Sequence, residues 1–137
     1  MSISPQVEPG SSDAPLWRPS PDRVSMAQMT RFAREAVAYG APSSGEYADL
    51  YRWSTVDPAA FWTAVWDYTG VIASARGTVA VEDPGRMPGA RFFPEARLNY
   101  AENLLRRRDS RDALVFWGED RVRRRLSHEA LYNEVSR

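Results

Sequence analysis

The sequence predicts an α+β fold that is mostly helical, with one β-hairpin and long irregular segments. Three observations lead to this prediction. Residues 57–70 carry helix signals at both ends of an aromatic stripe, and residues 83–96 hold three prolines and two glycines. Two β-rich runs, at 113–117 and 121–126, flank a short polar turn, which is the pattern of a hairpin.

The composition limits the chemistry that the chain can perform. The 137 residues carry a formal net charge of zero, so no global field favours nucleic acid or a membrane surface as a partner. There is no cysteine and all 18 basic residues are arginine, which excludes disulfides, thiolate ligands and a lysine Schiff base. No apolar run approaches the length of a membrane span and no signal-peptide pattern is present, so we expect a cytoplasmic location.

The N-terminal part is expected to become ordered gradually along the chain. Residues 1–14 have little apolar content and are predicted to form a disordered leader. Residues 15–43 follow as an N-terminal arm and helix. Ser25 and Gln28 have the spacing of a capping box, which predicts that this helix begins there and stops at Gly40.

The strongest helix signal lies at 57–70. Asp57 is suited to accept a first-turn N–H, Pro58 suits the first helical position, and Gly70 suits the left-handed position after the end. A broad apolar stripe follows this helix at helical spacing and consists of Phe61, Trp62, Val65 and Trp66. At roughly 25 cal/mol per Å² of buried apolar area, the stripe favours a large partner surface, which the rest of the chain looks too small to supply.

Shorter elements are predicted on either side of this helix. Residues 46–54 suggest a preceding helix. Asn99 opens, through a capping box, a helix that is predicted to run to about Arg108. After the hairpin, Ser127 is placed to cap a final helix.

The aromatic and amide side chains have structural interpretations that we favour over functional ones. Phe61, Trp62 and Trp66 could line a ligand groove, but a stripe at helical spacing is typical of a core. Asn99 and Asn103 could contact a ligand, yet we expect Asn99 to cap its helix and Asn103 to satisfy nearby backbone groups.

The arginine runs and the single histidine are interpreted in the same way. The arginines within 106–108 and 121–125 could bind phosphate or nucleic acid, but the acidic residues that flank them favour a solvated, salt-bridged face. His128 stands alone at the first turn of a helix, with no serine or cysteine partner in a recognisable motif. We therefore predict no catalytic, cofactor-binding or metal-binding residue in this chain.

Three sequence blocks together resemble a known family. They are L-W-R-P-S-P-D-R at 16–23, Y-R-W-S-T-V-D-P-A-A-F-W-T-A-V-W-D-Y-T-G at 51–70, and G-A-R-F-F-P-E-A-R-L-N-Y-A-E-N-L-L at 89–105. The combination resembles the N-terminal region of acetoacetyl-CoA synthetases, relatives of acetyl-CoA synthetase in the adenylate-forming superfamily. The resemblance implies an acetyl-CoA synthetase N-terminal-like region at 44–105 and a truncated start of the adenylation (AMP-binding) domain at 106–137.

This resemblance also implies a reaction for the full-length parent. Members of the family are α/β enzymes that join an acid to CoA through an acyl adenylate, and they use ATP, Mg²⁺ and CoA. Their phosphate loop ends in a lysine and a second lysine is used later, whereas this chain has no lysine. No family catalytic or substrate-binding residue can therefore be carried onto a position here, and no cofactor is expected in this chain itself.

The resemblance predicts that the chain is an N-terminal fragment of an AMP-forming acid–CoA ligase with a structural role, inactive alone. The expected partner is the remainder of the adenylation domain, whether missing or separately encoded. An alternative is a non-enzymatic interaction module that docks on a separately encoded ligase remainder or on a homologue. An arginine-rich nucleic-acid binder is a third possibility, which the zero net charge disfavours.

Overall fold

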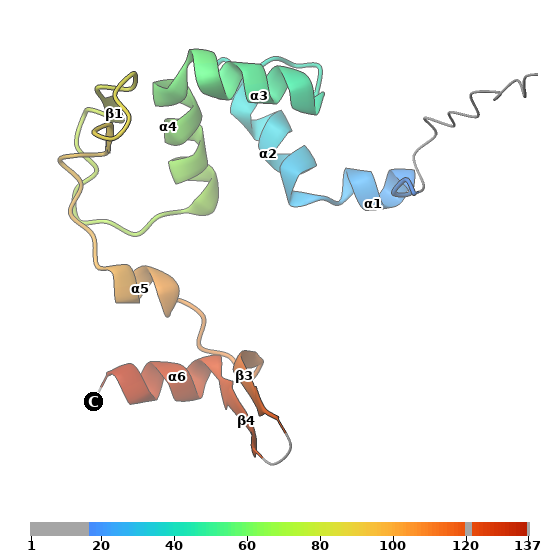
Figure 1. The fold of residues 1–137 in the computed structure, drawn as a ribbon, viewed down its shortest axis with the longest axis vertical. Coiled ribbons are helices and arrows are strands. Elements are labelled where there is room, and N and C mark those ends of the chain that lie inside the picture. Colours follow the sequence, from blue (N-terminus) through green and yellow to red (C-terminus); the bar gives the residue numbers. More distant parts are fainter. Residues whose placement is uncertain (1–16, 120–121, 137) are drawn as a thin grey trace, which may run out of the picture.

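The computed structural model describes residues 17–119 and 122–136, without the side chain of Val122. The predicted leader at 1–14 lies outside the described residues. The elements form two groups (Figure 1). One group contains the helices of the N-terminal half, and the other contains a β-hairpin and the last helix.

The N-terminal half is helical, as its sequence pattern predicts. Its elements are α1 (Pro21–Ser25), α2 (Gln28–Ala36), the 3-10 helix η1 (Val37–Tyr39), α3 (Tyr47–Val56) and α4 (Pro58–Thr69). The left-handed residue Gly40, with φ of 92°, follows η1 and ends the helical run where the sequence predicts.

The predicted capping box at Ser25 and Gln28 is wrong. Ser25 is the last residue of α1, and its hydroxyl donates to the carbonyl of Asp22 at 2.9 Å. Helix α2 begins after Ala27 with no side-chain cap. The physical reason is that Ser20 starts a helix earlier by accepting a first-turn N–H, so Ser25 is already used inside that helix.

Helix α4 begins and ends at the residues that the sequence indicates. The Asp57 carboxylate accepts the N–H of Ala60 at 3.0 Å, and Pro58 occupies the first turn. Gly70 adopts a left-handed conformation with φ 62° and ψ 50° just after the last turn.

The core of the N-terminal half lies between α2, α3 and α4. Phe61 of α4 lies edge-on to Phe32 of α2 and to Trp53 of α3, with ring centroids 5.9 and 5.6 Å apart. Tyr68, two turns further along α4, contacts Phe32 at 5.3 Å and donates its hydroxyl to the carbonyl of Gln28 at 3.0 Å. The buried residues of this core are Phe32, Ala33, Ala36, Ala41, Leu50, Trp53 and Ala64.

The proline- and glycine-rich segment after α4 contains a short strand pair in addition to the one hairpin that the sequence predicts. Strands β1 (Val81–Glu82) and β2 (Arg91–Phe92) are antiparallel and two residues long, too short to show a strand periodicity. Gly77 has a φ of 80°, and a Cβ there would lie 2.5 Å from the Cβ of Glu95. The Glu95 carboxylate accepts the N–H of Thr78 at 2.8 Å, which fixes this close approach.

The C-terminal half contains α5 (Tyr100–Leu104), β3 (Asp112–Gly118), β4 (Val122–Ser127) and α6 (His128–Val135). Strands β3 and β4 form the predicted hairpin, with Val115 opposite Arg125, and Ser127 caps α6 as predicted. Helix α5 is shorter than the predicted helix to Arg108, because Arg106 turns back to bind the end of α4.

The two groups of elements are joined through α5. Figure 1 shows α2, α3 and α4 together at one end, the hairpin and α6 at the other, and α5 in the connection between them. Among the residues that the structure describes, no helix is both long and apolar enough to cross a membrane.

The cap of α4 provides a test of this fold. Replacing Asp57 by Ala removes the acceptor for the Ala60 N–H, and we expect the free energy of unfolding to fall by about 1 kcal/mol. Asp57→Asn keeps a side-chain acceptor and should retain most of that stability. Urea unfolding followed by circular dichroism measures both variants, and equal losses in the two would contradict the capping role.

Candidate functional site

The aromatic stripe of α4 divides between two sides of the helix. Phe61 faces the core, whereas Trp62 lies edge-on to Phe92 at 5.2 Å and Trp66 packs against Phe93 at 4.5 Å. The prediction that the stripe is a core feature is confirmed for Phe61 and Val65, which pack against the core, whereas Trp62 remains 38% exposed. The irregular segment after α4 folds back onto this side of the helix and supplies part of the cover that the sequence led us to expect from outside the chain.

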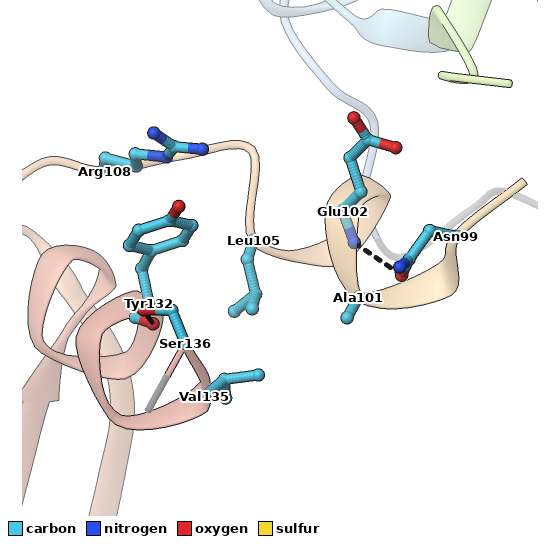
Figure 2. Close-up of a pocket in the computed structure, with 8 residues that line it drawn as sticks. All are labelled: Asn99, Ala101, Glu102, Leu105, Arg108, Tyr132, Val135 and Ser136. Atoms are coloured by element: carbon cyan, nitrogen blue, oxygen red, sulfur yellow. Dashed lines mark hydrogen bonds between the residues drawn. The ribbon is translucent and has the colours of Figure 1, made fainter. Parts of the chain in front are cut away.

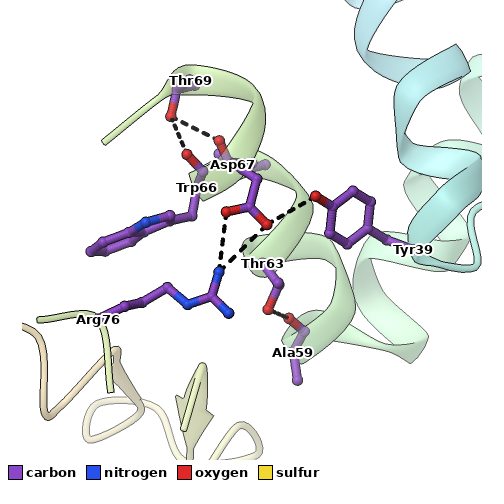
Figure 3. A network of polar contacts seen from close by, with 8 residues as sticks. Tyr39, Ala59, Thr63, Trp66, Asp67, Thr69 and Arg76 are labelled. Atoms are coloured by element: carbon purple, nitrogen blue, oxygen red, sulfur yellow. Dashed lines mark hydrogen bonds and ion pairs between the residues drawn. The ribbon is translucent and has the colours of Figure 1, made fainter. Parts of the chain in front are cut away.

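A polar network lies at the C-terminal part of α4 (Figure 3). Asp67 of α4 accepts the hydroxyl of Tyr39 at 2.9 Å and pairs with the guanidinium of Arg76 at 3.1 Å. This hydrogen bond to a carboxylate raises the pKa of Tyr39, because ionisation would place two negative charges together. The network joins η1, α4 and the loop after α4, so its charged groups serve the fold.

The amide of Asn103 binds main-chain groups at the exit of α4. Its oxygen accepts the N–H of Ile72 at 2.8 Å, and its nitrogen donates to the carbonyls of Ile72 at 2.8 Å and Asn99 at 3.0 Å. Asn99 in turn accepts the N–H of Glu102 at 3.2 Å. Both asparagines therefore have the structural roles that the sequence predicted.

Arg106 makes a second attachment to α4 that the sequence analysis missed. Its guanidinium donates to the carbonyls of Thr69 at 2.9 Å and Gly70 at 3.2 Å, which are among the groups that a helix C-terminus leaves without partners. The prediction placed Arg106 on a solvated, salt-bridged face. No local sequence signal links it to carbonyls that lie 36 and 37 residues away.

A cavity of about 430 Å³ lies between α5 and α6 (Figure 2). Arg108 lies over the ring of Tyr132, 3.9 Å from its centroid, so this cation is engaged with an aromatic face. The hydroxyl of Ser136 donates to the Tyr132 carbonyl at 2.7 Å and not to a base, unlike an activated nucleophile. The lining residues are Asn99, Ala101, Glu102, Leu105, Arg108, Tyr132, Val135 and Ser136.

The arginines of the hairpin are held in different ways. Arg125 pairs with Asp112 across the two strands, as the salt-bridged interpretation predicts. Arg123 instead lies over the ring of Trp117, with its guanidinium carbon 4.7 Å from the ring centroid. The prediction of a salt-bridged arginine is therefore corrected at this position. Arg121 lies outside the described residues.

His128 is the first residue of α6, and its backbone ties that helix to the turn before β3. Its backbone N–H donates to the carbonyl of Arg111 at 3.0 Å. Nearby, Asp109 accepts the Nε of Arg111 at 2.9 Å, and this contact lowers the pKa of the Asp109 carboxyl, with a smaller contribution from His128. Among the described residues, no hydrogen bond joins a hydroxyl group to the side chain of His128.

The hairpin leaves its apolar side chains exposed on both faces. Four consecutive residues of β3 retain half or more of their exposure: Leu114 54%, Val115 50%, Phe116 58% and Trp117 64%. Exposed apolar side chains gathered on one element of a folded chain are typical of an interaction surface. The hairpin is therefore a candidate surface for packing against another polypeptide.

The described residues contain no group of three or more His, Asp or Glu side chains that could hold a metal ion. Several of their charged groups bind one another, main-chain carbonyls or aromatic rings. The arrangement positions elements relative to one another and presents apolar surface.

Comparison with known proteins connects these features to a family. Residues 47–104 match the family model described as the acetyl-coenzyme A synthetase N-terminus. The chain is 44% identical over 126 residues to an acetoacetyl-coenzyme A synthetase of Rhizobium meliloti, a match that covers 92% of this chain and 19% of that protein. It is 35% identical over 99 residues to a malonamoyl-CoA synthetase of Penicillium aethiopicum, covering 72% of this chain and 13% of that protein.

A solved structure shows the same relationship. The acetoacetyl-CoA synthetase of Streptomyces lividans superposes with a TM-score of 0.72 at 39% identity, over 83% of this chain and 18% of that one. The chain therefore spans a fifth or less of the length of the relatives it matches. The resemblance that the sequence motifs indicated is confirmed, and it locates the chain at the N-terminal region of those enzymes.

The two hydrogen bonds between the Asn103 amide and the main chain of Ile72, here called the Asn103 clamp, should contribute measurably to stability. Asn103→Ala removes the side-chain partner of both main-chain groups of Ile72, and because water reaches Ile72, which is 38% exposed, we expect a loss of about 1 kcal/mol in unfolding free energy. Asn133→Ala, at an exposed position of α6, is the matched control and should change stability by less than about 0.5 kcal/mol. Similar losses in denaturant unfolding for the two variants would contradict the clamp.

The contact between Asp109 and Arg111 predicts a pH dependence. Because the folded-state pKa of Asp109 lies below its ordinary value of 3.8, its stabilising effect is present above that pH and disappears as the pH falls through the lowered pKa. An NMR titration of the Asp109 carboxyl should show a midpoint below 3.8, and Arg111→Gln should raise it. An unchanged midpoint in the variant would show that Arg111 is not the cause.

Proposed function

Because the chain matches the N-terminal region of acetoacetyl-CoA synthetases in both sequence and fold, we propose that it is the structural N-terminal portion of an acetoacetate–CoA ligase. In this proposal it has no ligase activity alone. It packs against the remainder of the adenylation domain, which supplies the acyl-adenylate and acyl-CoA steps.

The observation that carries this proposal is that the polar side chains of the matched region form hydrogen bonds within the chain itself. Asp67, Asn99 and Asn103 each bind another part of the same chain. A residue that recognises a ligand keeps at least part of its hydrogen-bonding capacity directed into a pocket. Here that capacity is directed to main-chain groups and to Tyr39 and Arg76, which supports a scaffolding role.

The described residues do not fit the groups that the family's reaction requires. No group of three or more His, Asp or Glu side chains lies together among them, and the arginine that lines the cavity between α5 and α6 lies on the ring of Tyr132. The chain also has no lysine to bind a phosphate. We therefore derive no catalytic step through ATP, Mg²⁺ or CoA in this chain and assign those steps to the remainder of the enzyme.

The exposed hairpin is the surface proposed to meet that remainder. Three apolar side chains of β3 are at least half exposed: Val115, Phe116 and Trp117. They remain exposed although β3 is paired with β4 and β4 leads directly into α6. Burying them against another part of the same ligase would remove apolar area from water. The same observation favours the second candidate function, in which the chain docks on a ligase remainder encoded separately.

The acid that the parent ligase takes is proposed from the relatives. The Rhizobium meliloti and Streptomyces lividans proteins are named for acetoacetate, and the Penicillium aethiopicum protein for malonamate. The higher identity to the Rhizobium protein favours acetoacetate, a short acid with a carbonyl at the β position.

A chimera tests this function. This chain replaces the matching N-terminal region of the Rhizobium meliloti enzyme, and pyrophosphate release is measured with ATP, acetoacetate and CoA. We expect the chimera to be active, the chain alone to be inactive, and the enzyme lacking the region to be inactive or insoluble. Ligase activity of the chain alone would contradict the proposal, as would a chimera no more active than the truncated enzyme.

A pair of variants in the chimera tests the docking surface. Leu114→Asp places a charge opposite Leu126 on the exposed hairpin and should lower activity or solubility at least about tenfold, since a buried unpaired carboxylate is costly. Val56→Asp introduces the same charge on α3, where Val56 is 77% exposed, and should have little effect. Equal effects of the two would place the docking surface elsewhere.

A further inference from the structure

Strand β3 presents a free edge as well as exposed faces. Within the described residues, the backbone hydrogen bonds outside the strand pairs include none from 113–118, so the outer edge of β3 has no main-chain neighbour. Unpaired N–H and C=O groups along such an edge are a template for another strand. The four residues that follow one another there, Leu114 to Trp117, are uncharged and at least half exposed.

The charge distribution determines which strand of the hairpin, β3 or β4, can pair with the same strand of a second copy. The other strand of the hairpin, β4, carries Arg123, Arg124 and Arg125 in succession. Two β4 strands placed side by side would therefore bring like charges together. The segment of β3 from Ala113 to Gly118 has no charged residue. Self-pairing therefore favours β3 over β4.

We propose that the chain by itself associates with a second copy through antiparallel pairing of the two β3 strands, centred on Phe116. The product is a four-stranded sheet in the order β4–β3–β3–β4. A two-fold axis perpendicular to the sheet passes between the two Phe116 residues, and Val115 of each copy lies opposite Trp117 of the other.

The arginine strands lie at the outside of this sheet. Three strand spacings separate the two β4 strands, which is about 14 Å and exceeds the Debye length of about 10 Å at 0.1 M salt. Repulsion between the two sets of arginines is therefore largely screened. The exposed side chains of β3 gain a cross-strand neighbour on each face, which stabilises the pair.

This inference is independent of the proposed function, because it concerns the chain in the absence of a ligase remainder. If the chain is a monomer but the chimera is active, self-association fails and the structural role stands. If the chain dimerises through β3 but the chimera is inactive, the structural role fails and self-association stands.

Sedimentation equilibrium of the purified 137-residue chain tests the proposal, and we expect the average mass to rise with concentration towards that of a dimer. Phe116→Glu places two carboxylates opposite each other across the axis, while Arg124, the cross-strand neighbour, keeps the hairpin charge-balanced. Its dissociation constant should rise at least about tenfold. Val56→Glu adds the same charge at an exposed site of α3 and should leave association unchanged.

Disulfide trapping gives a second measurement that does not depend on the charged variant. Because the chain has no cysteine, Phe116→Cys introduces a single thiol that lies opposite its own copy, and mild oxidation should link the dimer rapidly. Val56→Cys, at a more exposed position, should cross-link more slowly. A monomeric chain at all concentrations, equal effects of the two glutamate variants, or equal cross-linking of the two cysteine variants would each overturn the proposal.

Discussion

Helix α4 is held from two sides, and the positions of the other elements follow from that contact. Phe61 on one side packs between Phe32 and Trp53, and Trp66 on the other packs against Phe93. These ring contacts fix α2 and α3 on one side and the irregular segment on the other. A short helix with aromatic residues on both sides can therefore organise a segment that has few regular strands of its own.

The C-terminal half, from α5 onward, attaches to the end of α4 through side chains that bind main-chain groups. Asn103 pairs with Ile72, and Arg106 binds the last carbonyls of α4. Such contacts fix direction and spacing, while the apolar residues of the hairpin remain exposed. The result is one part that supplies its own core and another that presents unburied surface, which accords with an N-terminal portion of a larger ligase.

Local signals in the sequence were sufficient for α4, the hairpin and the caps at Asn99 and Ser127, because each depends on residues within one turn or strand. Contacts across 30 residues or more could not be predicted, and these include Arg106 on the end of α4. The expectation that the aromatic stripe packs in a core holds for Phe61 and Val65, whereas Trp62 stays 38% exposed. The partner of the stripe was misplaced, because Phe92 and Phe93 lie in a segment whose prolines and glycines hide any periodicity.

Amide hydrogen exchange, measured on the chain alone and in complex with the remainder of a related ligase, tests this account most directly. The account predicts that α4 is protected in both states, because its cover lies within the chain. Protection at residues 113–118 should increase in the complex with the ligase remainder. Protection gained at α4 with no change at 113–118 would contradict the account, because the surface completed by the enzyme would then be the helix and not the hairpin.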